Sequence, residues 1–342
     1  MNKLSMMTLV IPIISFIVTP IVQRIAIKIN AIDVPKDNRR IHKKPVPLLG
    51  GLAIYISFII GVILKNGHMT SSEVGIVLGA TIITFGGFID DLRDIKPVLK
   101  LFIQLFAATI LIIYGVRIGK VTNPVSSTSF FIDLGRLSVP LTIFWVVGVT
   151  NAFNLIDGLD GLSAGIALIA SVTLFIISIL NGRVEAAILT SILSSALIGF
   201  LPYNFYPATI FMGDTGSQLL GFLLAAISIE GTIKSATAFA LGVPILIFGV
   251  PIYDTLFAII RRKINGKPIM QADKGHLHHR LLDIGLTQKQ TVIVMYLISA
   301  ILGGISIIAM QMSTQRSYFL VTIVILIISF VAWKNNFFQH KE

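Results

Sequence analysis

Adjacent carboxylates, Asp90 and Asp91, directly follow an apolar run that ends in Gly86-Gly87-Phe88-Ile89. Near the edge of a hydrocarbon layer two neighbouring carboxylates lose hydration and repel each other, and a cation would relieve both costs. Adjacent carboxylates at a helix end, with lysines nearby, are suited to gathering Mg²⁺ or orienting a phosphate. An interfacial charged turn would contain the same pair, so the motif is weak by itself.

The strongest motif is the run Asn151, Asn154, Asp157 and Asp160, in which a polar residue recurs at every third position. In a continuous helix each step of three turns the side chain by about 300°, so Asn151 and Asp160 would face opposite sides. A glycine after each aspartate argues against an unbroken helix. We predict that a helix ends near Asp157 and that the irregular turn after it brings amide and carboxylate oxygens around one point.

Asp214 lies in the sequence Met-Gly-Asp-Thr-Gly-Ser, residues 212–217, at the start of another apolar segment. A glycine-rich stretch before a helix presents backbone N–H groups and the positive end of the helix dipole. We expect Asp214 to be a metal ligand there. The alternative is that Asp, Thr or Ser simply caps the helix.

Three histidines and an arginine, His276, His278, His279 and Arg280, lie in the polar segment 261–288. A spacing of two between the first two histidines suits a strand better than a helix face, and the chain has no cysteine to complete a zinc site. A cluster of His, Arg and Lys fits a diphosphate clamp better. For Asp254 the sequence leaves open an ion pair with Arg261 or an interfacial position.

A further basic segment, residues 39–47, contains two arginines, two lysines and two prolines and precedes Gly50-Gly51. It has two equal interpretations. It could be a cluster that only stops membrane transfer, or a stiffened loop whose cations face an anionic substrate.

The elements that must position these motifs are membrane helices. The chain has 342 residues, of which 55% are hydrophobic and 13% charged, against about 25% charged in a soluble domain. This composition excludes a soluble globular protein, a disordered chain and a fibrous repeat. We predict an all-α polytopic protein in one integral-membrane domain, residues 1–342. Its eleven apolar runs lie near 4–22, 48–64, 73–89, 98–116, 138–155, 162–180, 184–201, 218–229, 236–260, 290–309 and 317–333.

The first run is too long for a typical signal peptide and predicts a membrane helix. The run at 218–229 is short, and it could extend back through 213–217 or be a tilted, partly re-entrant segment. With the N-terminus outside, nineteen of the 27 Lys and Arg residues fall on the side that also holds the C-terminus, which the positive-inside rule makes cytoplasmic. The formal charge of +11 then reflects orientation, and we expect no nucleic-acid partner.

The acids follow the cations, since twelve of the sixteen Asp and Glu residues fall on the same side. All the motifs lie there too, although only Lys and Arg set the orientation. The predicted cytoplasmic segments are about 30–47, 90–97, 151–161, 202–217 and 261–288. We therefore expect one site that faces the cytoplasm.

Taken in order, the motifs resemble those of the polyprenyl-phosphate N-acetylhexosamine-1-phosphate transferases, over nearly the whole chain. The resemblance implies a place in a bacterial cytoplasmic membrane. The His-x-His-His-Arg sequence is similar to the WecA/TagO branch and differs from the His-His-His run of enzymes that use UDP-MurNAc-pentapeptide. The resemblance implies transfer of GlcNAc-1-phosphate from UDP-GlcNAc to undecaprenyl phosphate, with Mg²⁺ or Mn²⁺, giving undecaprenyl-diphosphate-GlcNAc and UMP. Such a product starts wall teichoic acid, O-antigen or a related glycopolymer, and a homodimer is compatible with it.

The resemblance also implies a role for each polar group. The metal ligands would be Asn154 and Asp214. The carboxylates at the reacting phosphates would be Asp90, Asp91, Asp157 and Asp160. The lipid phosphate would be bound by Lys44 and Lys100, and the donor by His276, His278, His279 and Arg280.

Three other classes fit the sequence less well. A transporter of an anionic substrate predicts ionisable residues near the centres of its spans, whereas these spans are nearly free of them. A scaffolding membrane protein has no reason to collect such motifs on one side. A transferase of the CDP-alcohol class would have an Asp-Gly-x-x-Ala-Arg pattern, which the chain lacks.

Overall fold

Helices make up nearly all of the regular structure in the computed structural model, which describes residues 3–35, 44–65, 67–122, 131–233, 242–268, 275–335 and 337. In chain order the helices are α1 (Lys3–Lys28), α2 (Gly50–Leu64), α3 (Ser71–Arg93), α4 (Pro97–Ile113), α5 (Ser138–Ile156), α6 (Leu162–Leu180), α7 (Val184–Asn204), α8 (Gly213–Ser228), α9 (Gly242–Ile247), α10 (Gly249–Ile264), α11 (Leu277–Asp283), α12 (Gln288–Gln311) and α13 (Thr314–Lys334). The prediction of an all-α fold is confirmed.

Four short strands form two antiparallel pairs at the ends of the bundle. Strand β1 (Ile32–Asp33) pairs with β2 (Val46–Pro47), and β3 (Lys120–Thr122) pairs with β4 (Phe131–Asp133). The first pair joins the end of α1 to the beginning of α2 and so helps to place α2.

Seven of the described helices are long and apolar enough to cross a membrane: α1 from Thr8, α3, α5 with the turn before it, α6, α7, α12 and α13. The other four predicted spans coincide with shorter helices. With a rise of 1.5 Å per residue, the 15 residues of α2 reach only about 22 Å, less than the hydrocarbon core of about 30 Å. The structure therefore supports a multi-pass membrane protein with seven such helices and does not confirm eleven.

The ninth predicted span is two helices rather than one. Helix α9 ends at Ile247 and α10 begins at Gly249, with Phe248 between them. Each helix opens with the sequence Gly-Val-Pro, and proline in the first turn of a helix needs no backbone hydrogen-bond donor. The repeated tripeptide is the local signal for this break.

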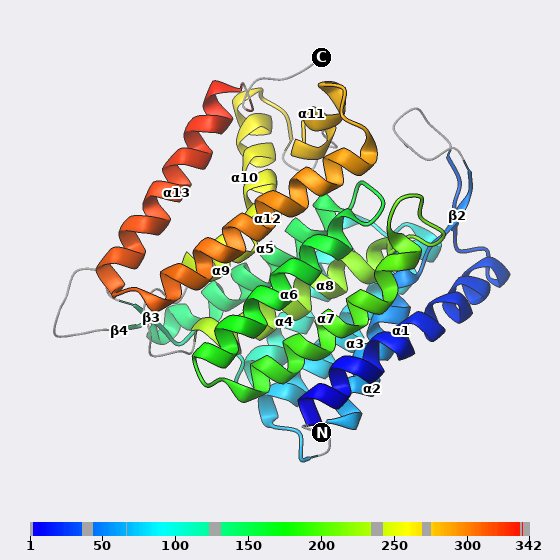
Figure 1. Ribbon diagram of the computed structural model, residues 1–342, viewed down its shortest axis with the longest axis horizontal. Coiled ribbons are helices and arrows are strands. Elements are labelled where there is room, and N and C mark those ends of the chain that lie inside the picture. Colours follow the sequence, from blue (N-terminus) through cyan, green and yellow to red (C-terminus); the bar gives the residue numbers. More distant parts are fainter. Residues whose placement is uncertain are drawn as a thin grey trace.

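Helix α8 lies at the centre of the bundle and contacts α2, α3, α5, α6 and α7 (Figure 1). Every residue from Thr215 to Ser228 is buried, as expected for a helix that is apolar on all sides. The helix begins at Gly213, so the short predicted span does extend back through residues 213–217. A π-helical turn, Ile229–Ile233, continues it.

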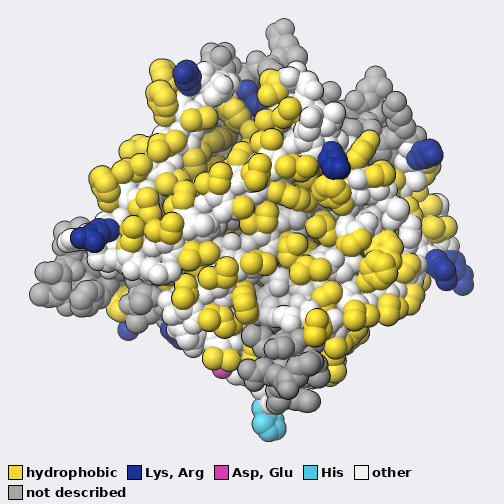
Figure 2. Space-filling model, in the orientation of Figure 1, with side chains coloured by type: hydrophobic (Ala, Val, Ile, Leu, Met, Phe, Trp, Pro, Cys, Tyr) yellow, Lys and Arg dark blue, Asp and Glu magenta, His cyan; other side chains and the backbone are white. Residues whose placement is uncertain are grey.

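Large apolar side chains cover the outside of the bundle. Examples are Ile13 on α1, Phe102 on α4 and Phe319 on α13, which are 58%, 64% and 71% exposed. Figure 2 shows this apolar surface as a broad face with Lys and Arg at its margins. An apolar surface of this extent is unusual on a soluble monomer and fits contact with lipid.

The chemical motifs lie at helix ends on one side of the molecule. Figure 1 shows α11, the far end of α10 and strand β2 at this side, and the beginning of α1 at the opposite side. Asp90 and Asp91, which were predicted to follow their helix, belong to α3, and Asn151 and Asn154 belong to α5, in line with the predicted helix end near Asp157. Helix termini, rather than long loops, therefore build the site.

Candidate active site

The site is built around the N-terminus of α8, which two other helices approach very closely. Gly51 of α2 donates its N–H to the Met212 carbonyl oxygen (3.0 Å), and a Cβ at position 51 would overlap the Gly216 backbone. A Cβ at position 87 of α3 would lie 2.5 Å from Thr215 Cα. Only glycine permits such contacts, so these two glycines fix where α8 begins.

Asp91 caps α8 from another helix. Its Oδ1 accepts the Asp214 N–H (2.7 Å) and its Oδ2 accepts the Thr215 N–H (3.1 Å) and the Thr215 hydroxyl. The local N-cap residue, Met212, makes no side-chain cap. The alternative that Asp214 or Thr215 caps its own helix is therefore wrong for this structure. The Asp214 carboxylate lines the cavity instead.

Asp214 and Asn154, the two predicted metal ligands, lie side by side. Asn154 Nδ2 donates to Asp214 Oδ1 (2.6 Å) and to Ser217 Oγ (2.9 Å). With its amide turned over, Asn154 would place an oxygen beside the Asp214 carboxylate. The structure thus brings together two residues that are 60 positions apart.

Lys100 lies between two of the carboxylates. Its Nζ forms an ion pair with Asp90 Oδ2 and lies 3.5 Å from Asp214 Oδ1. Asp90 Oδ1 also accepts the Ile95 N–H (3.0 Å). One cation therefore joins the aspartate pair of α3 to the aspartate of α8, as expected for a group that meets a phosphate there.

Helix α5 ends at Ile156, as predicted, and Asp157 is its C-cap residue. Burial raises the pKa of Asp157 well above its usual range, and the negative charges of Asp214, Asp91 and Asp160 raise it further. Four acids whose charges act on one another at this short range would attract a cation.

The turn after Asp157 is held by two contacts. Asp160 Oδ2 accepts the Ala208 N–H (2.9 Å), which ties this turn to the segment that follows α7. The hydroxyl of Tyr296, on α12, donates to the Gly161 carbonyl oxygen. Asp160 is therefore engaged in holding the site together, as Asp91 is.

A cavity of about 950 Å³ opens among these groups. Its lining includes all five predicted site aspartates together with Lys100 and Asn154. The volume suits a nucleotide-sized ligand. Asn151, the first residue of the periodic motif, is bonded instead to Gln104 (2.7 Å) and supports helix packing.

The donor set fits a magnesium ion. Oxygen ligands are what Mg²⁺ prefers, and it usually takes one or two carboxylates and completes its shell with water and substrate phosphate. Asp214 and Asn154 offer a carboxylate and an amide, and Asp157 has a raised pKa that a nearby cation would lower. Within the described residues, no three His or acidic side chains converge closely enough to hold a metal alone.

The predicted donor-binding histidines lie on and beside α11, and they do not form a strand. His276 is the N-cap residue with extended backbone, and His278 follows in the first turn. The two rings stack in parallel, 5.8 Å apart with 8° between their planes. A Cβ at position 158 would lie 2.7 Å from His278 Nε2, so His278 packs against Gly158 in the cavity wall. His279 is half-buried beside it, with ring centroids 4.3 Å apart.

Of the six predicted substrate-binding residues, only Lys100 is among the described residues that line the cavity. The Arg280 guanidinium donates to the carbonyl oxygens of Asn335 (3.4 Å) and Phe337 (3.3 Å) and lies over the Phe337 ring. Lys44 is exposed, and it is not among the described residues that line the cavity. A role for either in binding substrate stays a prediction.

The sequence did not identify three residues that support the site. Asp254 pairs with His276, Tyr296 holds the turn after Asp160, and Gln104 holds Asn151. Each acts across more than twenty positions of the chain. No local spacing signals these contacts, apart from the cost of placing a carboxylate in an apolar helix at position 254.

The fold and the cavity define a polytopic membrane enzyme whose site joins carboxylates and a lysine, an arrangement typical of phosphoryl transfer. Residues 74–232 match the model of glycosyl transferase family 4. The chain is 42% identical to a probable undecaprenyl-phosphate N-acetylglucosaminyl 1-phosphate transferase of Bacillus subtilis, over 92% of this chain and 87% of that protein.

A decaprenyl-phosphate N-acetylglucosaminephosphotransferase of Mycobacterium tuberculosis is 33% identical over 87% of this chain and 80% of its own. A phospho-N-acetylmuramoyl-pentapeptide-transferase of Clostridium beijerinckii is 30% identical over 81% of this chain and 87% of its own. The chain therefore belongs to the polyprenyl-phosphate N-acetylhexosamine-1-phosphate transferases of glycosyl transferase family 4. It is a glycosyl-1-phosphate transferase, and the resemblance seen in its motifs is confirmed.

Proposed function

We propose that this protein transfers GlcNAc-1-phosphate from UDP-GlcNAc to undecaprenyl phosphate, giving undecaprenyl-diphosphate-GlcNAc and UMP. The observation that carries the proposal is the 42% identity to the Bacillus subtilis relative, which extends over 92% of the chain. The product would be the first lipid-linked intermediate of a cell-wall glycopolymer such as teichoic acid.

The chemistry requires charge neutralisation more than acid–base catalysis. A phosphate monoester has its second pKa near ~6, so the acceptor is already a nucleophile at neutral pH. UMP leaves as a stabilised phosphate. The barrier comes from bringing two anions together, and fixed positive charge lowers it. We favour direct attack by the acceptor phosphate over a covalent aspartyl intermediate.

The cavity supports a division of roles. Lys100, which lies between Asp90 and Asp214, is placed to meet the acceptor phosphate. Asp214 and Asn154 would hold Mg²⁺, which when bound neutralises charge on the donor diphosphate. Asp91 and Asp160 already accept backbone N–H groups, so they would position α8 and the turn after α5.

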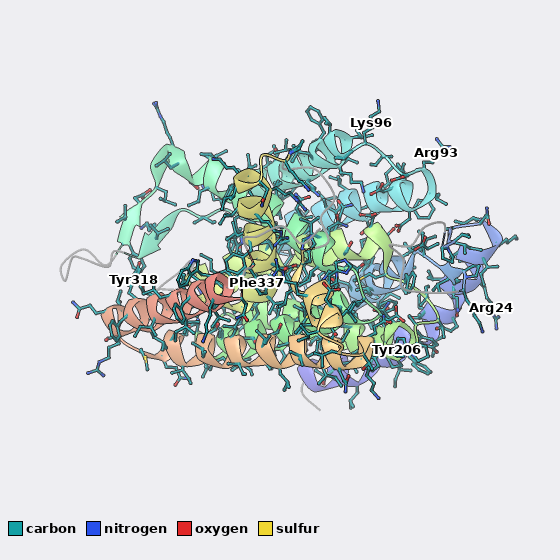
Figure 3. The ribbon with its side chains drawn as sticks, turned by 90° about the horizontal axis from the view of Figure 1, so that it is seen from above. Arg24, Arg93, Lys96, Tyr206, Tyr318 and Phe337 are labelled. Carbon is teal, nitrogen blue, oxygen red and sulfur yellow. The ribbon has the colours of Figure 1, made fainter. Side chains whose placement is uncertain are left out.

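We also propose that the site faces the cytoplasm, with the beginning of α1 outside and eleven membrane passages. Arg24, Arg93 and Lys96 lie at the margin of the molecule on the site's side and point outward (Figure 3). Cations at this level fit the cytoplasmic interface under the positive-inside rule. The short helices α2, α4 and α8, and the pair α9 and α10, would complete the passages by local thinning of the bilayer.

The experiment is a transfer assay with purified protein, undecaprenyl phosphate and several labelled UDP-sugars. We expect lipid-linked GlcNAc-1-phosphate and UMP in equal amounts with Mg²⁺, none after chelation, and recovery when Mg²⁺ or Mn²⁺ is restored. Transfer from UDP-MurNAc-pentapeptide but not from UDP-GlcNAc would move the proposal to the other branch. Movement of UDP-sugar into vesicles without a lipid product would indicate a transporter.

A further inference from the structure

A buried acid–histidine pair joins α10 to the start of α11, and its aspartate has no role in the reaction assigned above. Asp254 of α10 is 6% exposed and His276 is also 6% exposed. His276 Nδ1 lies 2.7 Å from Asp254 Oδ2. Because an ionised carboxylate can only accept, the proton of this bond belongs to Nδ1, and Nε2 is the nitrogen left for a second partner.

Asp254 also fixes the backbone from which His276 projects. Its Oδ1 accepts the Leu277 N–H (2.7 Å), so one carboxylate holds both the ring and the first residue of α11. The His276 ring in turn stacks in parallel on His278, which packs against Gly158. A continuous chain of contacts therefore leads from Asp254 to the turn that carries Asp157.

A buried carboxylate is costly, and a well-packed apolar side chain would fill the same volume at lower cost. The two hydrogen bonds compensate for that cost and hold the histidine in one orientation. Second partners of this kind are familiar where a histidine must present one ring nitrogen at a fixed place.

We propose that Asp254 is a positioning residue for nucleotide-sugar binding, which acts by holding His276, and through the stacked ring His278, against the Asp157–Gly158 turn. The inference rests on the proposed function, because it assumes that the histidines meet the diphosphate of the donor. Asp254 itself does not touch the substrate.

The test is a cycle of four proteins: wild type, Asp254→Asn, His276→Gln and the double variant. Asparagine keeps the size of Asp254 and an oxygen for the Leu277 N–H but loses the charged acceptor for His276. We expect Asp254→Asn to raise the KM for UDP-GlcNAc about tenfold, with less than a twofold change in the KM for undecaprenyl phosphate. In the His276→Gln background the same change should add less than twofold.

A second readout separates positioning from simple folding. Asp254→Asn should elute as wild type in size-exclusion chromatography. Asp283→Asn, which alters an exposed aspartate at the end of α11, should keep the wild-type KM for both substrates. A wild-type KM for Asp254→Asn would overturn the proposal. An equally large rise in the KM for UDP-GlcNAc in the wild-type and His276→Gln backgrounds would also overturn the proposal, because Asp254 would then act only through the backbone of α11.

Failure of the Asp254 proposal is distinguishable from failure of the proposed function. Wild-type turnover of UDP-GlcNAc is measured first and decides that question alone. If the wild type uses a different nucleotide sugar, the same four proteins are compared with that sugar, and the cycle still decides whether Asp254 acts through His276.

Discussion

At the scale of single residues, the site aspartates differ in how far their oxygens are already engaged. Asp91 accepts two backbone N–H groups and a hydroxyl at the start of α8, whereas the Asp214 carboxylate contacts the side chains of Asn154 and Lys100. Carboxylates that the sequence does not distinguish therefore have different roles in the structure. One fixes a helix, and the other presents its charge to the cavity.

Replacing Asp91 by asparagine should destabilise the protein. The amide can accept through only one oxygen, so the cap of α8 loses at least one hydrogen bond, at a cost of about 1–2 kcal/mol. The measurement is the unfolding midpoint in detergent. Asp94→Asn is the control, because Asp94 is exposed in the same turn and its left-handed backbone (φ 49°) suits asparagine. Equal midpoints for the two variants would contradict the capping role.

His278 should make the protein sensitive to acid. Burial, and then the charges of His279 and His276, lower the pKa of His278 to about 3, against about 6.5 in the unfolded chain. Below pH ~6.5 the unfolded state therefore takes up a proton that the folded state refuses. Stability is lost as the pH falls from about 6.5 towards 3.

The predicted loss of stability in acid is checked by comparing the unfolding midpoints of His278→Gln and wild type at pH 8 and pH 5. The fall in unfolding midpoint between the two values should be smaller for the variant. His68→Gln, which alters an exposed histidine, should leave the fall unchanged. If His278→Gln loses as much stability on acidification as wild type, the histidine does not carry the effect.

At the scale of elements, the site depends on how closely α2 and α3 approach the N-terminus of α8. Gly51→Ala would place a methyl group on the Gly216 backbone, which cannot move without shifting Asp214. Such overpacking costs about 1–3 kcal/mol. We expect a lower unfolding midpoint together with loss of transfer activity.

The matched change is Gly148→Ala in α5. A Cβ there meets nothing within 4 Å among the described residues, and alanine favours a helix by about 1 kcal/mol over glycine. Gly148→Ala should keep wild-type activity and an equal or higher midpoint. A Gly51→Ala protein that is as active and stable as Gly148→Ala would show that the close approach is unnecessary.

The sequence predicted the elements that depend on local signals. The end of α5 before Asp157 and the start of α8 at Gly213 follow from glycines beside polar residues. What it could not predict are contacts made by the tertiary fold. Asp91 meets α8 across 123 positions, and no local spacing distinguishes it from Asp90. The pairing of Asp254 with His276 was likewise open, because two helices must first be placed side by side.

At the scale of the whole molecule, charge and apolarity describe an enzyme that works at a membrane surface. The apolar outer face of the bundle fits contact with lipid (Figure 2), and five aspartates line the cavity on the side of the site. In the proposed topology the excess of positive charge sets the orientation, and Lys100 shows that a cation on that side can also belong to the site.

The absence of cysteine from the sequence allows a direct test of this orientation. Single cysteines at two exposed positions, Lys96→Cys and Glu185→Cys, lie on opposite sides of the membrane in the proposed topology. In intact cells a membrane-impermeant maleimide should label position 185 and spare position 96 until the cells are opened. The reverse pattern would place the site outside.

The central claim is that the cavity around Asp214 carries out the transfer. The most direct measurement is the initial rate of GlcNAc-1-phosphate transfer from UDP-GlcNAc to undecaprenyl phosphate by Asp214→Asn, beside Glu185→Gln as a control at the other end of the bundle. We predict a fall of about 100-fold or more for Asp214→Asn, with unchanged membrane insertion, and a normal rate for the control. A near-normal rate for Asp214→Asn would contradict the account.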